Sequence, residues 1–264
     1  MAKRLFKFIG IIMLYAFILE GCSSAAEPPE VDYAPIDNQA EQQSFQGEVI
    51  ENGTTLLITP SEDSNEARSS DKISVGLDGA TLVDETGESI TANELQIGDI
   101  LVITYNGVIA ESYPAQIDVT KIERVDHNNL LDGYLALIDN IYQEDDGLNS
   151  EIDTIALDTS EWINLTDVEK ELILNQVKEA YNYEVIEGTY DELAEQGVID
   201  KENLYFPTGV LIKISEMQYD KNKEKITCGI SKWRGGLGAI GADEVTAILK
   251  EERWSITKEG SWIS

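Results

Sequence analysis

Cysteine and histidine are nearly absent from this chain of 264 residues, which has two cysteines and one histidine. The single histidine, His127, excludes metal sites built on histidine pairs. Only Cys22 and Cys228 could form a disulfide, so at most one covalent bridge is possible. A G-x-S-x-G nucleophile elbow is also missing. We therefore expect no catalytic residues, no metal site and no cofactor, and predict that the protein is not an enzyme.

Basic residues are also scarce. The chain has 19 Lys and Arg and 50 Asp and Glu, which gives a formal charge of −31. A phosphate backbone would be repelled by such a field, and no basic stripe interrupts it. Nucleic acid is therefore excluded as a partner. Cations, or a partner with a basic surface, remain open. The simpler interpretation of the charge is a soluble surface that does not self-associate.

Long apolar runs are lacking except at the start, where Phe8 to Leu19 carries no charge and follows three basic residues. A dozen residues are too few to cross a bilayer of about 30 Å as a helix, and they suit the core of a secretory signal. The run ends in Leu19-Glu20-Gly21-Cys22, which resembles the lipobox of bacterial lipoproteins, although Glu20 departs from the small residue usual there. The resemblance implies cleavage after Gly21 and acylation of Cys22. Cys228 is then left without a partner, so no disulfide is expected in the fold. We expect a lipoprotein on the extracytoplasmic face of the cell membrane, in a Gram-positive bacterium.

The remaining chain divides by composition into a tether and two folded regions. Residues 22–44 contain three prolines and little periodicity, so we expect a disordered tether. Residues 45–125 contain short alternating strands, and Asn52-Gly53 is a strong signal for a tight hairpin. A second hairpin is expected around Asn106-Gly107. Many short strands with one helical turn favour a small OB-like β-barrel.

A resemblance to a known family supports the prediction of a small β-domain at residues 45–125. The stretch ELQIGDILVITYNGVIAESYPAQI, residues 94–117, resembles the signature of an uncharacterised small β-domain of Gram-positive lipoproteins, with matches at Leu95, Gly98-Asp99, Glu111-Ser112 and Tyr113-Pro-Ala-Gln116. The family implies no activity. Tyr113 is a candidate for a binding surface, and the alternative is a tyrosine that packs beside a bend at Pro114.

Residues 128–264 begin with helical patterns and end with strands. Capping boxes at Thr166 and Thr189 predict two helix starts, and an alternating pattern from Val210 onward predicts an antiparallel meander. Helices followed by a meander favour α+β packing, and by analogy a cystatin-like or NTF2-like arrangement. The predicted fold class is therefore α+β overall: an OB-like β-domain at 45–125 followed by an α+β domain at 128–264.

Residues 231–245, SKWRGGLGAIGADEV, contain a G-x-G-x-x-G pattern at Gly236 to Gly241. A dinucleotide site needs a helix after this motif and a second strand beyond it, but the 23 residues that follow favour a β-hairpin. We therefore predict a tight loop between strands and no nucleotide. The segment SKWRGGLGAIGA resembles a stretch of other uncharacterised Gram-positive secreted proteins, which implies a domain but no ligand. Trp233 and Arg234 are candidates for a recognition patch; the alternative is a core tryptophan beside a paired arginine.

The function predicted from these observations is non-catalytic binding at the cell envelope. The N-terminal lipid is expected to attach the protein to the membrane. The expected partner is a protein, a peptide or a wall component. The alternative is a carboxylate-dependent hydrolase acting on wall glycans. A hydrolase requires a cleft with two carboxylates roughly 5–9 Å apart. A binding module requires an exposed aromatic or apolar patch instead.

Overall fold

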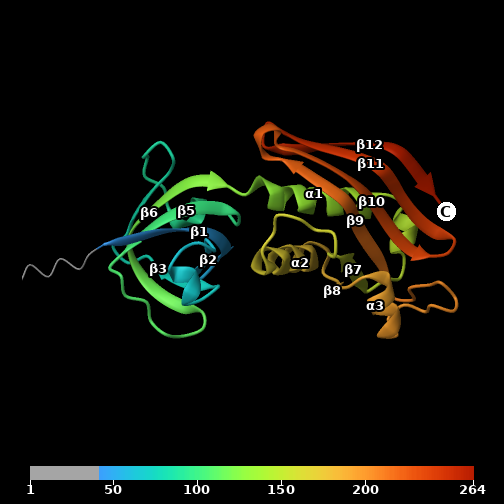
Figure 1. Cartoon of the computed structure of the whole chain (residues 1–264), viewed down its shortest axis with the longest axis horizontal. Coiled ribbons are helices and arrows are strands. Elements are labelled where there is room, and N and C mark those ends of the chain that lie inside the picture. Colours follow the sequence, from blue (N-terminus) through green and yellow to red (C-terminus); the bar gives the residue numbers. More distant parts are fainter. Residues whose placement is uncertain (1–41) are drawn as a thin grey trace, which may run out of the picture. The chain divides into compact units, whose positions relative to one another are not determined.

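The computed structural model describes residues 42–264, which contain a closed barrel and a second sheet (Figure 1). The barrel contains strands β1 (Gln43–Asn52), β2 (Leu56–Pro60), β3 (Ile73–Gly76), β5 (Asp99–Tyr105) and β6 (Ala115–His127). Antiparallel pairs join β3 to β2, β2 to β1, β1 to β5 and β5 to β6. A parallel pair between β3 and β6 closes the ring. The short strand β4 (Thr81–Val83) lies parallel to the later half of β6.

Alternation along the strands explains why this part of the sequence closes into a barrel. Every second residue of β5 is buried, so one side of the strand faces the interior. The interior is filled by branched and aromatic side chains, including Val49, Ile58, Leu101, Ile103 and Ile122, all fully buried. The expected second hairpin is not formed: β5 pairs with β1 and β6, and residues 108–111 supply only one bridge, from Ala110 to Gln116.

The second sheet has six strands in the order β12 (Arg253–Ile263), β11 (Gly238–Lys250), β10 (Lys225–Gly235), β9 (Gly209–Asp220), β7 (Thr154–Asp158) and β8 (Glu184–Glu187). Strands β9 to β12 form an antiparallel meander. Strand β7 instead lies parallel to both β8 and β9. The meander was expected from the alternating pattern, whereas the parallel pairs depend on connections through helices.

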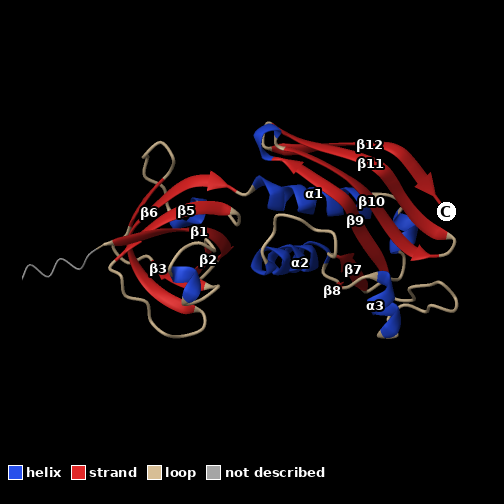
Figure 2. Ribbon diagram, viewed as in Figure 1, coloured by secondary structure: helices blue, strands red, loops and turns tan. Residues whose placement is uncertain are grey.

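The helices of the described chain lie on both faces of this sheet (Figures 1 and 2). Helices α1 (Asn129–Gln143) and α2 (Asp167–Tyr181) pack their apolar residues against inward-facing side chains such as Ile212 and Ile230. Helix α3 (Tyr190–Glu195) covers part of the opposite face through Leu193. Both α2 and α3 begin at capping boxes, on Thr166 and Thr189, as the sequence predicted. A 3-10 turn, η3 (Asp146–Asn149), follows α1, and three further turns are η1 (Glu66–Arg68), η2 (Ala92–Glu94) and η4 (Lys221–Lys223).

The predicted fold class is wrong. Residues 42–264 are mostly β, with 46% strand and 22% helix, and their three α-helices accompany a five-stranded barrel and a second sheet. The fold is therefore not α+β with a cystatin-like or NTF2-like domain. The prediction gave too much weight to the helical patterns between residues 128 and 195, because capping boxes and apolar spacing mark the start of a helix but not its length. Helix α3, for example, has only six residues. Within residues 42–264, no helix is long and apolar enough to cross a membrane.

Candidate functional site

The glycine-rich segment lies in the hairpin that joins β10 to β11. Gly236 and Leu237 form the turn, and a strand, not a helix, follows from Gly238. Close packing explains the glycines at both ends of the segment. A Cβ on Gly235 would lie 3.1 Å from the ring of Tyr205, and one on Gly241 would lie 2.4 Å from the indole of Trp262. Gly235 and Gly241 therefore allow other chain segments to approach the hairpin closely.

Apolar side chains are exposed around this turn. Leu237, at its tip, is 97% exposed, and Leu204 and Tyr205 are 51% and 40% exposed. Together with Leu148 they line a hollow of about 440 Å³, whose floor is the glycine backbone. We call these four residues, Leu148, Leu204, Tyr205 and Leu237, the hairpin patch. Contiguous exposed apolar surface on a soluble domain indicates a binding site more often than an isolated exposed leucine does.

The backbone of the patch is held in place although Leu204, Tyr205 and Leu237 are exposed. Leu204 has a φ of 50°, in the left-handed region that a leucine seldom adopts. Its carbonyl accepts a 2.8 Å hydrogen bond from the Gly236 amide, and the next residues are fixed by Tyr205–Asp200 and Phe206–Arg234 backbone bonds. A conformation of this kind costs about 1–3 kcal/mol and persists only where neighbouring structure imposes it. The fold therefore stabilises a strained, exposed leucine beside Leu237.

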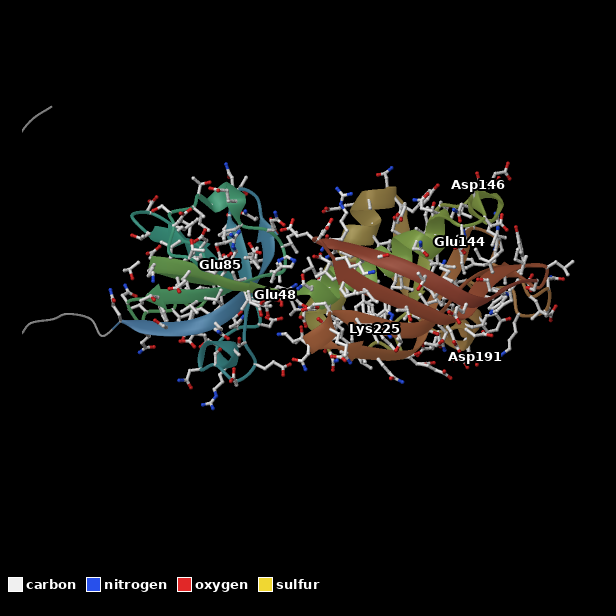
Figure 3. The ribbon with its side chains drawn as sticks, turned by 90° about the horizontal axis from the view of Figure 1, so that it is seen from above. Glu48, Glu85, Glu144, Asp146, Asp191 and Lys225 are labelled. Carbon is white, nitrogen blue, oxygen red and sulfur yellow. The ribbon has the colours of Figure 1, made fainter. Side chains whose placement is uncertain are left out.

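Two cations from β10 fix the segment that carries Leu148. Lys232 is fully buried, and its Nζ donates to the carbonyls of Tyr142, Glu144 and Asp145 and to Asn149 Oδ1. Burial lowers the pKa of Lys232 to about 8, although the carboxylates of Asp145, Glu144 and Asp146 oppose this shift. Figure 3 shows Glu144 and Asp146 on the segment that follows α1.

Arg234, two residues further along β10, holds the same segment. Its Nη1 donates to the carbonyls of Leu148, at 3.0 Å, and of Ser150. The guanidinium also lies 5.7 Å from the ring centre of Tyr205, within the range of a cation–π contact. Arg234 thereby joins η3 to the exposed aromatic residue of the hairpin patch.

The structure separates the residues that the sequence had suggested as one patch. Trp233 and Arg234 are consecutive in β10 and point to opposite faces of the sheet. Trp233 packs edge-on against Tyr190 of α3, with ring centres 5.1 Å apart, while Arg234 borders the hairpin patch. Tyr113 is 71% exposed on the barrel loop between β5 and β6, and its hydroxyl lies 3.5 Å from Asp71. Leu19, Glu20, Gly21 and Cys22 lie outside the described residues.

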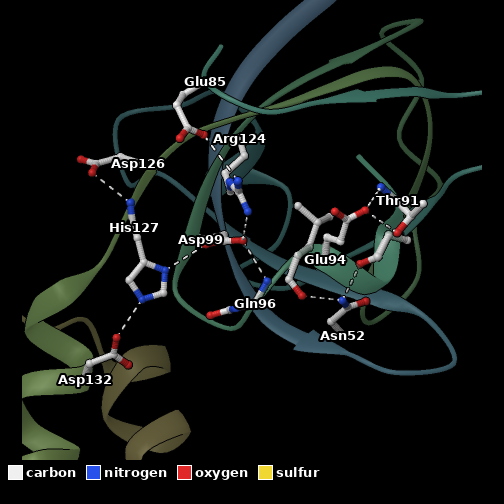
Figure 4. A network of polar contacts seen from close by, with 12 residues as sticks. Asn52, Glu85, Thr91, Glu94, Gln96, Asp99, Arg124, Asp126, His127 and Asp132 are labelled. Atoms are coloured by element: carbon white, nitrogen blue, oxygen red, sulfur yellow. Dashed lines mark hydrogen bonds and ion pairs between the residues drawn. The ribbon is translucent and has the colours of Figure 1, made fainter. Parts of the chain in front are cut away.

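His127 forms the centre of an ion cluster where β6 meets α1 (Figure 4). Its Nδ1 lies 2.9 Å from Asp99, and its Nε2 lies 2.9 Å from Asp132. These hydrogen bonds, with Asp132 the larger influence, raise the pKa of His127 to about 10. The imidazole is therefore protonated at neutral pH, and both ring nitrogens donate. Arg124 extends the cluster through Asp99 and Glu85, at 3.9 and 3.5 Å. Because each carboxylate has a cationic partner, the cluster joins structural elements and holds no free general acid.

A buried pair of carboxyls is formed by Glu48 of β1 and Glu169 of α2. The side-chain amide of Asn128 donates to both oxygens of Glu48, at 3.2 Å, and to Glu169, at 2.7 Å. Burial, reinforced by the charge of Glu169, raises the pKa of Glu48 to about 8. Glu169 is the carboxylate of the α2 capping box, in which it accepts a hydrogen bond from the Thr166 amide. Both residues are only 8% exposed, although they line a surface hollow of about 470 Å³.

Groups of three or more His, Cys, Asp or Glu side chains arranged to hold a metal ion are absent from residues 42–264. Cys228, which the sequence placed on an apolar strand face, is a free thiol in the core, and burial raises its pKa to about 12. It is therefore poorly suited to act as a nucleophile.

Sequence reasoning missed the hairpin patch. The available signal was Leu237, an apolar residue between two glycines at the centre of a predicted turn, where a polar residue is usual. Leu204 and Tyr205 gave no such signal, since the backbone pairing of residues 204–206 with 234–236 brings them there. Comparison with protein-family models, curated proteins and solved structures found no match to this chain.

Proposed function

We propose that this protein is a non-catalytic binding protein whose hairpin patch receives a segment of another protein. The observation that carries the proposal is Leu237, almost fully exposed at a hairpin tip beside the strained Leu204. A patch whose backbone is already held by hydrogen bonds loses less conformational entropy on binding than a mobile loop does. Tyr205 adds a rigid aromatic ring beside an arginine, two residue types that dominate the energetics of interfaces.

The charge near the patch indicates the chemistry of the partner. Asp146 and Glu151 flank Leu148 in the chain, and Glu202 precedes Leu204; all three are exposed. Arg234, the basic residue in the hollow, is already bonded to two carbonyls. An apolar centre with acidic neighbours, in a chain of charge −31, favours a partner segment with apolar side chains next to Lys or Arg.

We further propose that the protein works at the cell envelope, held to the membrane by lipid on Cys22. The support is the basic start, the uncharged run to Leu19 and the sequence Leu19-Glu20-Gly21-Cys22. Two acyl chains are sufficient for stable anchoring.

A pair of synthetic peptides tests the binding proposal. Both have the same leucine pattern and length, and their polar positions are all Lys in one and all Glu in the other. In fluorescence anisotropy the full chain should bind the Lys peptide and not the Glu peptide, and added salt should weaken this binding. The double variant L204S/L237S should lose about tenfold or more in affinity, since buried anchors contribute 1–2 kcal/mol or more each.

Val108→Ser is the matched control, because Val108 is 65% exposed on the barrel, outside the patch. It should bind the Lys peptide as the parent chain does. Equal binding of both peptides would contradict the proposal. Binding of the Lys peptide that survives in L204S/L237S would show attraction to the net charge alone.

Glu48 and Glu169 are the pair of carboxyls to test for the hydrolase alternative. Glu48 has the raised pKa of a general acid, at about 8, and Glu169 lies within reach of the same amide. Burial of both residues favours a structural role over catalysis. Release of reducing ends from cell-wall glycan, abolished in Glu48→Gln, would establish the alternative.

A further inference from the structure

The face of the second sheet opposite α1 and α2 is only partly covered. Strand register places Asp158, Lys213, Ser231, Gly241 and Trp262 in one row across β7, β9, β10, β11 and β12. Residues directly opposite each other in neighbouring strands point to the same face, so these five share it. Helix α3 covers only the adjacent row, through the contact of Tyr190 with Trp233.

A hollow of about 330 Å³ lies where the cover of α3 ends. Its lining includes Asp158, Tyr190, Leu211, Lys213, Ser231 and Trp233. This volume is at the small end of the range for small-molecule sites. The lining combines an aromatic wall from Tyr190 and Trp233 with a polar floor. Such a combination suits a ligand that has both an apolar face and hydroxyl groups.

Each charged side chain that lines the hollow already has a partner of opposite charge. Lys213 Nζ lies 3.6 Å from Asp158, which is 4% exposed, and 2.8 Å from Glu161, and Asp191, which also lines the hollow, is paired with Lys201 at 3.0 Å. Asp158 in turn accepts a 2.5 Å hydrogen bond from Ser160. The ammonium is therefore already paired and offers no free charge to an anion, and its presence disfavours a cation. A neutral polar ligand fits this balance better than an ion does.

A second tryptophan extends the site along the row. The indole of Trp262 lies directly over Gly241, where a Cβ would come within 2.4 Å of the ring. Its Nε1 donates to Asp243 at 3.1 Å, which fixes the ring, yet the residue remains 37% exposed. Trp233 and Trp262 thus flank the small residues Ser231 and Gly241 on one face of the sheet.

We infer that this hollow binds a sugar unit of a neutral glycan, a hexose or N-acetylhexosamine, against Trp233, and that the glycan continues along the row to Trp262. A pyranose ring has an apolar C–H face that packs on an aromatic wall. Its hydroxyls both donate and accept hydrogen bonds. They can therefore accept from the Lys213 ammonium, donate to the Asp158 carboxylate, and do either with the Ser231 hydroxyl. This site is separate from the hairpin patch, which Arg234 borders on the other face of β10, so it does not depend on the proposed protein partner.

The test titrates chitotriose, cellotriose and maltotriose into the full chain by calorimetry, with two-dimensional NMR of the four tryptophan indole N–H groups. At least one trisaccharide should bind with 1:1 stoichiometry and shift the Trp233 and Trp262 resonances. Ser231→Val, which removes a hydroxyl and fills the floor, should weaken binding about tenfold, the loss expected for one or two neutral hydrogen bonds. Trp262→Ala, on an edge strand, should weaken it by a similar factor.

Circular dichroism melting confirms that each variant is folded. L204S/L237S is the control and should bind the trisaccharide as the parent chain does, because the hairpin patch is not part of this site. Failure of all three sugars to saturate the protein at about 10 mM would overturn the inference, since binding would be weaker than the millimolar range. Binding that changes less than twofold in both Ser231→Val and Trp262→Ala would also overturn it. Neither result would bear on the Lys-peptide binding proposed for the hairpin patch.

Discussion

The ammonium of Lys232 lies 2.9 Å from the backbone carbonyl oxygen of Tyr142, in the last turn of α1. A fully buried lysine thus satisfies the carbonyls that the helix leaves unpaired at its C-terminal end. The same ammonium reaches Asn149, so it also fixes the segment that carries Leu148 into the hairpin patch.

Replacement of this lysine should be among the most destabilising changes on β10. Lys232→Met keeps the volume but leaves several buried oxygens without a donor, and we expect a loss of about 3 kcal/mol in the free energy of unfolding. Urea unfolding measures it. Lys225→Met, on the same strand at a half-buried position, should change stability by less than about 0.5 kcal/mol. Equal losses in the two variants would contradict the capping role.

Glu48 should make stability depend on pH. Its pKa is about 8 in the folded protein and 4.5 in the unfolded reference, so the folded state binds the proton more tightly. Its contribution is complete below pH 4.5 and is lost as pH rises through about 8. Glu48→Gln cannot ionise and should therefore melt several degrees above the parent at pH 9, with little difference at pH 4.5.

Glu62→Gln is the control for this experiment, because Glu62 lines the same hollow as Glu48 but is exposed. It should follow the pH profile of the parent chain. A Glu48→Gln profile parallel to that of the parent would show that Glu48 ionises normally.

His127 should titrate far above its usual range. Because it is the only histidine, a single Cε1–H resonance reports its protonation in NMR. Its pKa is raised to about 10, so its contribution to stability is fully present below about pH 6.5 and is lost as pH rises through about 10. Asp132→Asn removes the larger influence and should lower the midpoint of the titration. A parent midpoint near 6.5 would be incompatible with the ion cluster.

The glycines of the G-x-G-x-x-G segment should respond unequally to substitution. Gly241→Ala places a methyl group 2.4 Å from the Trp262 indole and 2.7 Å from the Ile230 carbonyl, and should cost about 1–3 kcal/mol and shift tryptophan fluorescence. At Gly236 the nearest atom is 3.7 Å away, so Gly236→Ala should be tolerated. Urea unfolding compares the two, and equal losses would show that the packing around Trp262 does not explain the motif.

Lipidation should depend on one cysteine. In a Gram-positive host fed labelled palmitate, the parent chain should take up label and sediment with membranes, and Cys22→Ala should do neither. Cys228→Ala should behave as the parent does, because Cys228 is buried in the core. Label retained by Cys22→Ala would disprove the lipobox prediction.

Local patterns predicted many of the elements and little of their assembly. The capping boxes at Thr166 and Thr189 start α2 and α3 because each box is a contact between neighbouring residues. The Asn52-Gly53 signal marks the β1–β2 hairpin, in which Asn52 ends β1 and residues 53–55 form the connection. The parallel contacts of β7 with β8 and β9 could not be foreseen, since each joins strands separated by helices and loops.

The sequence by itself determined the strong negative charge, the shortage of residues for disulfides and histidine metal sites, and the segments that form isolated helices and hairpins. These properties follow from composition and from contacts within a few residues. Tertiary structure alone decided which sites Trp233 and Arg234 join, because α3 meets Trp233 on one face of the sheet and η3 meets Arg234 on the other. It also brought Leu204 beside Leu237, 33 positions apart, through backbone bonds that no local pattern encodes.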